Sequence, residues 1–136
     1  MSKEVVHYDY KNDDLNDCLT YNSPTNFNAN DISGIVAEVA GANDEFNWWW
    51  IIKLKNKKYI LLSAGCDYTG WDCQSWIRRE EIYNTALKAA KASPLKEEYA
   101  NRNIQKNLIL QIKGKQPYGL YDSKHEVKDN PKKENE

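Results

Sequence analysis

No long hydrophobic run occurs in this chain of 136 residues. The longest apolar stretch, Trp48 to Ile52, is far shorter than the about 20 apolar residues that a membrane-spanning helix needs. Charged side chains also interrupt the first ten residues, which therefore lack the apolar centre of a secretory signal peptide. These absences predict a cytoplasmic protein that does not contact a membrane.

An excess of charge of either sign is also lacking, because 19 Lys and Arg residues oppose 20 Asp and Glu residues. Three of the cations are arginine, the residue best suited to gripping phosphate: Arg78, Arg79 and Arg102. A nucleic-acid-binding domain usually carries a clear basic excess. The composition therefore argues against nucleic acid as a partner.

Cysteine and histidine are scarce, with three cysteines (Cys18, Cys66, Cys73) and two histidines (His7, His125). The odd cysteine count favours a reducing compartment over a disulfide framework. Structural zinc sites usually place about two to four residues between paired cysteines, whereas six separate Cys66 from Cys73. A zinc site or a disulfide between these two is the weaker alternative. We interpret both as small buried residues at the ends of a packed loop, and we predict no cofactor.

Alternation typical of strands dominates the middle of the chain. Residues 35–40 and 47–55 each fit a strand, and Asn56-Lys57 fits the tight turn of a hairpin whose returning strand is 59–64. One face of the second strand carries Trp48, Trp50, Ile52 and Leu54. The pattern predicts an antiparallel β-meander of three or more strands.

After residue 76 the apolar spacing becomes helical. One apolar face fits a helix from about 79 to 92, and Ser93-Pro94 has the N-cap and first-turn proline of a second helix. Residues 107–113 belong to that second helix, although their alternation fits a strand equally. Strands followed by helices predict an α+β fold in which two helices pack on one face of the meander.

The length predicts a single α+β domain over residues 1–121. Within it, residues 1–31 are rich in Asn and Asp, which favour turns, and we expect a weakly structured N-terminal segment. The apolar residues that fit one helical turn there are Leu15, Cys18 and Leu19. Residues 122–136 mix both charge signs with almost no apolar side chains, which predicts a disordered tail.

Tryptophan is concentrated in one part of the chain, since all five lie between Trp48 and Trp76. Trp48 and Trp50 are expected in the core. Exposed Trp and Tyr near polar groups are common anchors of recognition surfaces. The candidate binding residues on this criterion are Asp67, Tyr68, Trp71, Asp72, Trp76 and Trp49. An alternative makes Trp71 a lid folded down on the sheet.

Two further classes of function are open to the loop 66–73. Asp67, Asp72 and the cysteines could line a small-ligand or metal pocket, or an Asp/Cys centre could make the protein a small enzyme. The chain carries no phosphate-binding loop, dinucleotide fingerprint or nucleophile elbow. We therefore favour a non-catalytic binding protein.

The loop also carries a resemblance. Residues 65–75 read G-C-D-Y-T-G-W-D-C-Q-S after a Trp-bearing strand and a Lys-rich hairpin, and Q-P-Y-G follows at 116–119. This combination, over residues 34–76 and that short piece, resembles a set of small uncharacterised proteins of phages, prophages and bacteria. Small phage proteins often inhibit host proteins, CRISPR effectors among them. The resemblance therefore implies that the partner is a host or bacterial protein. One expectation is that this protein inhibits its partner, as an anti-CRISPR protein does.

Overall fold

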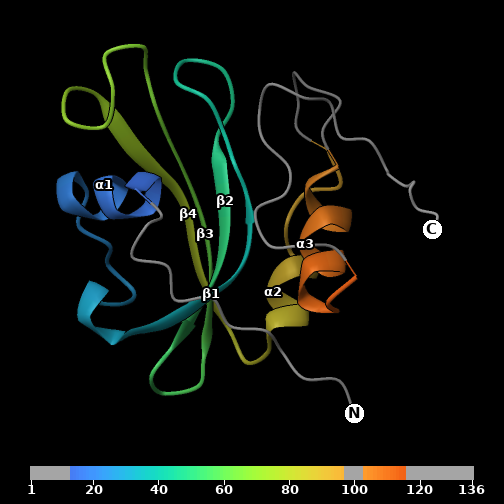
Figure 1. Ribbon diagram of the computed structural model, residues 1–136. Coiled ribbons are helices and arrows are strands. Elements are labelled where there is room, and N and C mark those ends of the chain that lie inside the picture. The colour runs from blue at the N-terminus through green and yellow to red at the C-terminus, as the bar shows by residue number, and fades with distance from the viewer. Residues whose placement is uncertain (1–12, 97–102, 116–136) are drawn as a thin grey trace.

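The computed structural model describes residues 13–96 and 103–115, and Figure 1 shows their arrangement. Four antiparallel strands form one sheet in the order β1 (Ile32–Val39), β2 (Trp48–Leu54), β3 (Tyr59–Cys66) and β4 (Ser75–Tyr83). The helices are α1 (Asp13–Tyr21), the short 3-10 helix η1 (Ala29–Asp31), α2 (Ala86–Lys91) and α3 (Ile104–Ile112). The predicted α+β fold, a β-meander followed by two helices, is confirmed.

Several predictions concern other parts of the chain. The disordered tail at 122–136, the motif at 116–119 and both histidines lie outside the described residues. The single domain over 1–121 stays a prediction for the same reason.

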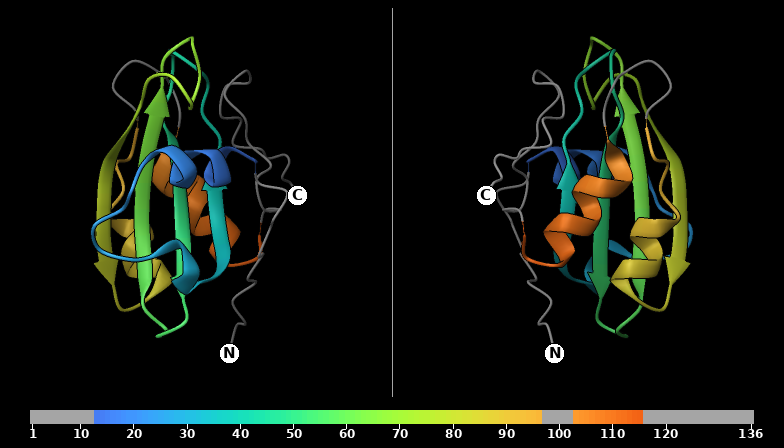
Figure 2. Two further views of the ribbon diagram at one scale, coloured as in Figure 1. Left: turned by 90° about the vertical axis from the view of Figure 1, so that its left-hand side faces the viewer. Right: turned by 90° about the vertical axis from the view of Figure 1, so that its right-hand side faces the viewer.

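The sheet is covered on both faces, with α1 on one side and α2 and α3 on the other (Figures 1 and 2). On the α1 face, alternate side chains of β2 meet Leu15 and Cys18 of the helix. Those side chains are Trp48, Trp50, Ile52 and Leu54, as the alternation predicts. Burial of Leu15 and Cys18 explains why the helical turn expected in a weakly structured segment is instead a helix from Asp13 to Tyr21.

The opposite face is packed by the two later helices. Trp49, Ile51 and Leu61 point to this side and form a second apolar cluster with α2 and α3. The helices contribute Ala86, Ala89, Ala90, Ile104 and Leu108. Since α2 offers only alanine to the sheet here, it can approach closely, and all eight residues of β3 are buried between the two layers.

The hairpin predicted at Asn56-Lys57 joins β2 to β3. Its left-handed residue is Lys57, with φ 71°, while the Asn56 side chain accepts a hydrogen bond from the Lys58 N–H at 2.9 Å. A turn followed by a left-handed residue is a usual three-residue hairpin connection.

The helix expected over 79–92 is wrong. Ser75–Tyr83 forms strand β4 along β3, and only Ala86–Lys91 is helical, with the Thr85 side chain capping its first turn. The helical spacing of the apolar residues was misleading because β4 is an edge strand whose side chains are mostly half-buried, so its sequence does not alternate cleanly.

The second helix begins later than Ser93-Pro94 indicates. The Pro94 carbonyl accepts a hydrogen bond from the Gln105 N–H at 3.1 Å, and α3 starts at Ile104. Residues 107–112, left open between helix and strand, are helical. Gly114 has φ 72° and its N–H bonds the Gln111 carbonyl at 3.0 Å, which closes the helix in a glycine C-cap.

A side chain of α3 covers part of the outer edge of β1. The Glu38 N–H donates to Gln111 Oε1 at 2.9 Å, and Gln111 Nε2 donates to the Glu38 carbonyl at 2.8 Å. The amide therefore pairs with the strand as a neighbouring backbone would, at an edge that could otherwise recruit another chain.

We expect Gln111→Ala to lower the free energy of unfolding by about 2 kcal/mol, because it leaves a buried N–H and a buried carbonyl of β1 without their partner. Urea denaturation measures the change. Lys113→Ala, an exposed change just after the same helix, is the control and should stay within about 0.5 kcal/mol of the parent. Equal stability of the two variants would show that the Gln111 amide contributes nothing.

Candidate functional site

Two connecting loops, residues 40–47 and 67–74, lie together at one end of the sheet, opposite the 55–58 hairpin (Figure 1). We call this the loop end. The Asp44 N–H donates to the Cys66 carbonyl at 2.8 Å and so ties the first loop to the start of the second. The loop end is therefore a joined surface.

The 67–74 loop is closed by its own hydrogen bonds. The Asp67 N–H donates to the Gln74 carbonyl at 3.0 Å across the base of the loop. The Asp67 carboxylate accepts from the Thr69 N–H at 2.8 Å and from the Thr69 hydroxyl. Gly70 has φ 103°, a conformation that a side chain would oppose. Asp67 therefore acts first as an internal cap of the loop.

Trp71 anchors this loop to the core. Its ring is buried against Trp48, with ring centroids 5.0 Å apart and planes inclined by 54°. Its indole N–H donates to the Asp14 carboxylate at 3.1 Å, which also links the loop to α1. This arrangement is the lid considered above as the alternative for Trp71.

The six residues predicted to bind a partner fall into three places. Tyr68 is 78% exposed near the tip of the loop, beside exposed Asp72 and half-buried Asp67. Trp71 lies beneath the loop. Trp49 and Trp76 lie on the opposite face of the sheet, where both line a cleft. The structure thus brings together Asp67, Tyr68 and Asp72 on one exposed loop, and their role in binding stays a prediction.

The two loop cysteines differ from each other. Cys66 is buried, as expected, but Cys73 is exposed, so the interpretation of both as buried residues is wrong for Cys73. The reason is that Trp71, two residues earlier, fills the space under the loop and turns the following residues outward. Both thiols are free, as is Cys18. Burial raises the pKa of Cys18 to about 12 and that of Cys66 to about 11.

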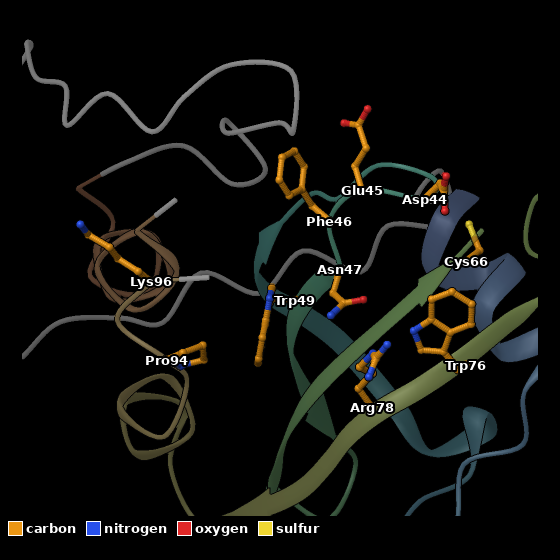
Figure 3. A pocket seen from close by; sticks show the side chains of 10 residues that line it. All are labelled: Asp44, Glu45, Phe46, Asn47, Trp49, Cys66, Trp76, Arg78, Pro94 and Lys96. Carbon is orange, nitrogen blue, oxygen red and sulfur yellow. The ribbon is translucent and has the colours of Figure 1, made fainter. Parts of the chain in front are cut away.

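A cleft of about 660 Å³ opens on the α2–α3 side of the loop end (Figure 3). It is lined by Asp44, Glu45, Phe46, Asn47, Trp49, Cys66, Trp76, Arg78, Pro94 and Lys96. Arg78 stacks on Trp76, with its guanidinium carbon 5.5 Å from the ring centroid. The pairing of β3 with β4 shifts between Ser63 and Ala64 and skips Arg78, which marks a bulge.

The sequence analysis missed Arg78, Asn47, Phe46 and Lys96 as members of a site. Trp76 and Arg78 are two residues apart, so a strand places them on one face, and this spacing was the available signal. The helical spacing of the apolar residues that follow concealed this two-residue signal.

Arg79, next to Arg78, has a structural role. It donates to the Glu81 carboxylate at 2.6 and 2.8 Å and to the Ala92 carbonyl at 3.1 Å, just after α2. Hydrogen bonding from Arg79 lowers the pKa of Glu81 below its usual value, and the Tyr83 hydroxyl also donates to Glu81. This network fastens the end of α2 to β4 beside the cleft.

Within residues 13–96 and 103–115, no group of three or more His, Cys, Asp and Glu side chains is arranged to hold a metal ion. In the same residues, no helix is long and apolar enough to cross a membrane. No protein-family model, no curated protein and no solved structure matches this chain.

Replacing Trp71 by Ala should lower the free energy of unfolding by about 3–5 kcal/mol, because it removes a buried indole and the contact with Trp48. Tyr68→Ala, three residues earlier and exposed, should change stability by less than about 0.5 kcal/mol. Denaturant unfolding of both variants separates the two roles. Similar losses in the two variants would mean that Tyr68 is also part of the packing.

Reaction with an aromatic disulfide reagent at about pH 8 should modify one thiol quickly, Cys73, because it is the exposed one. Cys18 and Cys66 should react only after denaturant is added, since burial both shields them and raises the pKa of each thiol. Counting released chromophore before and after unfolding measures this. Cys73→Ser is the control, and a fast phase that survives it would contradict the assignment.

Proposed function

We propose that this chain is a non-catalytic binding protein that recognises a partner protein through its loop end. The observation that carries the proposal is a large aromatic side chain, Tyr68, left 78% exposed on a loop whose conformation is held from within. Tyr is among the residues enriched at the energetic centres of interfaces, and a loop of fixed conformation presents it in one place.

The support beneath Tyr68 suits this role. Asp67 caps the loop and Trp71 locks it onto Trp48 and Asp14, so the loop pays little ordering entropy when a partner arrives. A rigid tyrosine has few side-chain torsions to lose and presents an apolar ring with a polar end. Tyr68 on this loop therefore resembles an anchor that is ready before binding.

The charges of the loop end indicate the partner's surface. Four carboxylates lie on its two loops, Asp44, Glu45, Asp67 and Asp72. The opposite end of the sheet carries lysines on the hairpin, Lys55, Lys57 and Lys58. A partner that accepts Tyr68 in an apolar pocket with a basic rim would match this distribution, and the carboxylates would speed and orient the encounter.

The resemblance of the loop to small phage and bacterial proteins supports a narrower form of the proposal. In that form the protein acts in the cytoplasm and inhibits a host or bacterial protein, for example a component of a CRISPR defence complex. The loop end would then cover a working surface of that partner.

In the test, the full-length protein is immobilised on a resin and exposed to a bacterial lysate, and mass spectrometry identifies the captured proteins. The affinity for the purified partner is then measured. Tyr68→Ala should weaken binding at least about tenfold while the protein stays folded, because an aromatic anchor is lost. Asp72→Asn should weaken binding by a smaller factor than Tyr68→Ala does. This loss of affinity should be larger at low salt, where the charge of Asp72 is less screened.

Tyr21→Ala is the matched control, since Tyr21 is also an exposed tyrosine but lies at the end of α1. It should bind as the parent does. If Tyr68→Ala retains the partner as well as Tyr21→Ala does, the loop end is not the recognition surface.

A further inference from the structure

The cleft on the α2–α3 side has a floor that depends on Gly65 of β3. A Cβ atom at this position would lie 2.4 Å from Asn47 Oδ1 and 3.1 Å from Trp76 Nε1. The missing side chain therefore leaves room for the Asn47 amide and the Trp76 indole to come together over the strand. Figure 3 shows the Trp76 nitrogen on the side of its ring that faces Asn47.

The Trp76 N–H is a donor in need of an acceptor. It is buried and has no hydrogen-bond partner among the described residues, although most of the buried polar groups in native proteins are satisfied. A buried donor at the wall of an open cleft is a position that a bound oxygen atom can complete after a small movement of the ring.

One cation stands beside this donor, and a second lies across the cleft. Arg78 contacts the face of Trp76, and no carboxylate of residues 13–96 or 103–115 forms an ion pair with it. Neighbouring Arg79, by contrast, is held by Glu81 at 2.6 Å. Lys96 lines the cleft from the segment that follows Pro94. Among the described lining residues, the cleft thus offers a guanidinium beside Trp76 and an ammonium group on the opposite side.

The other walls are flat and apolar. Trp49, Trp76 and Phe46 supply aromatic surface, and Pro94 closes the side next to α2. Two acidic side chains, Asp44 and Glu45, lie at the rim; Asp44 is on the side of Cys66 and Trp76, and the Glu45 carboxylate points away from Arg78 in Figure 3. Its described lining therefore combines aromatic walls with Arg78 beside Trp76, Lys96 on the opposite side and two acidic side chains at the rim.

From this arrangement we infer that the cleft binds a small planar molecule that carries an oxyanion, either a carboxylate or a phosphate. The oxyanion accepts hydrogen bonds from the Arg78 guanidinium. The planar body lies against the indoles of Trp49 and Trp76. A volume of about 660 Å³ falls within the range usual for small-molecule sites. This site is distinct from the exposed loop around Tyr68.

The experiment titrates the full-length protein with two acids and their neutral counterparts. The carboxylate pair is 2-naphthoate and 2-naphthamide, and the phosphate pair is adenosine 5′-monophosphate and adenosine. The readout is the indole N–H resonance of Trp76, assigned with Trp76→Phe. We expect at least one acid to shift this resonance saturably and its neutral counterpart to bind at least about tenfold more weakly. The pair that responds tells carboxylate from phosphate.

Three variants test the residues. Arg78→Ala should weaken the acid at least about tenfold, and Arg78→Lys, which keeps the charge but not the fork, should weaken it by a smaller factor. Lys55→Ala removes a cation from the distant hairpin and should bind as the parent does. The amide spectrum of each variant reports that it is folded.

Three results would overturn the inference. The first is the absence of a saturable shift with either acid up to about 5 mM, which corresponds to negligible affinity. The second is equal binding of an acid and its neutral counterpart, because the cations would then play no part. The third is an equal loss in Arg78→Ala and Lys55→Ala, which would indicate attraction to overall charge.

Discussion

Complete burial of β3 is the constraint on which the rest of the structure depends. All eight residues of this strand are buried, so neither face of the sheet can be left to water. The α1 helix and Trp71 cover one face, while α2 and α3 cover the other. A short chain has little apolar surface to bury, and a central strand that is covered on both faces takes part in two apolar clusters at once. The ends of the sheet are then the places left for exposed loops.

Trp71 connects this packing to the loop that we propose as a recognition surface. The same side chain that completes the α1 face also fixes the conformation of residues 67–74 through Trp48 and Asp14. Stability and presentation are therefore coupled: loss of Trp71 would disturb the surface without any contact to a partner. Tyr68, three residues earlier, is exposed, and we expect its loss to leave the packing intact.

Two adjacent arginines divide a structural role from a candidate binding role. In a regular strand, Arg78 and Arg79 would point to opposite faces. The bulge opposite Ser63 and Ala64 makes Arg78 an extra residue, and both arginines reach the α2–α3 side. Arg79 forms an ion pair with Glu81 and donates to the carbonyl of Ala92 after α2, whereas Arg78 stacks on Trp76 in the cleft. On the α2–α3 face, Arg79 therefore links β4 to the end of α2, and Arg78 adds a positive charge to the lining of the cleft.

Local pattern alone determined the central hairpin of the meander. The alternation around Trp48–Leu54 and the hairpin at Asn56-Lys57 depend on near neighbours in the chain, so residue order was enough to place β2 and β3 and to put Trp48 and Trp50 in the core. Only the tertiary structure made residues 75–83 a strand, because pairing with β3 outweighed their helical spacing. It likewise turned Cys73 outward, buried Trp71 and gathered Asn47, Trp76 and Arg78 around Gly65, since contacts between distant segments leave no period in a sequence.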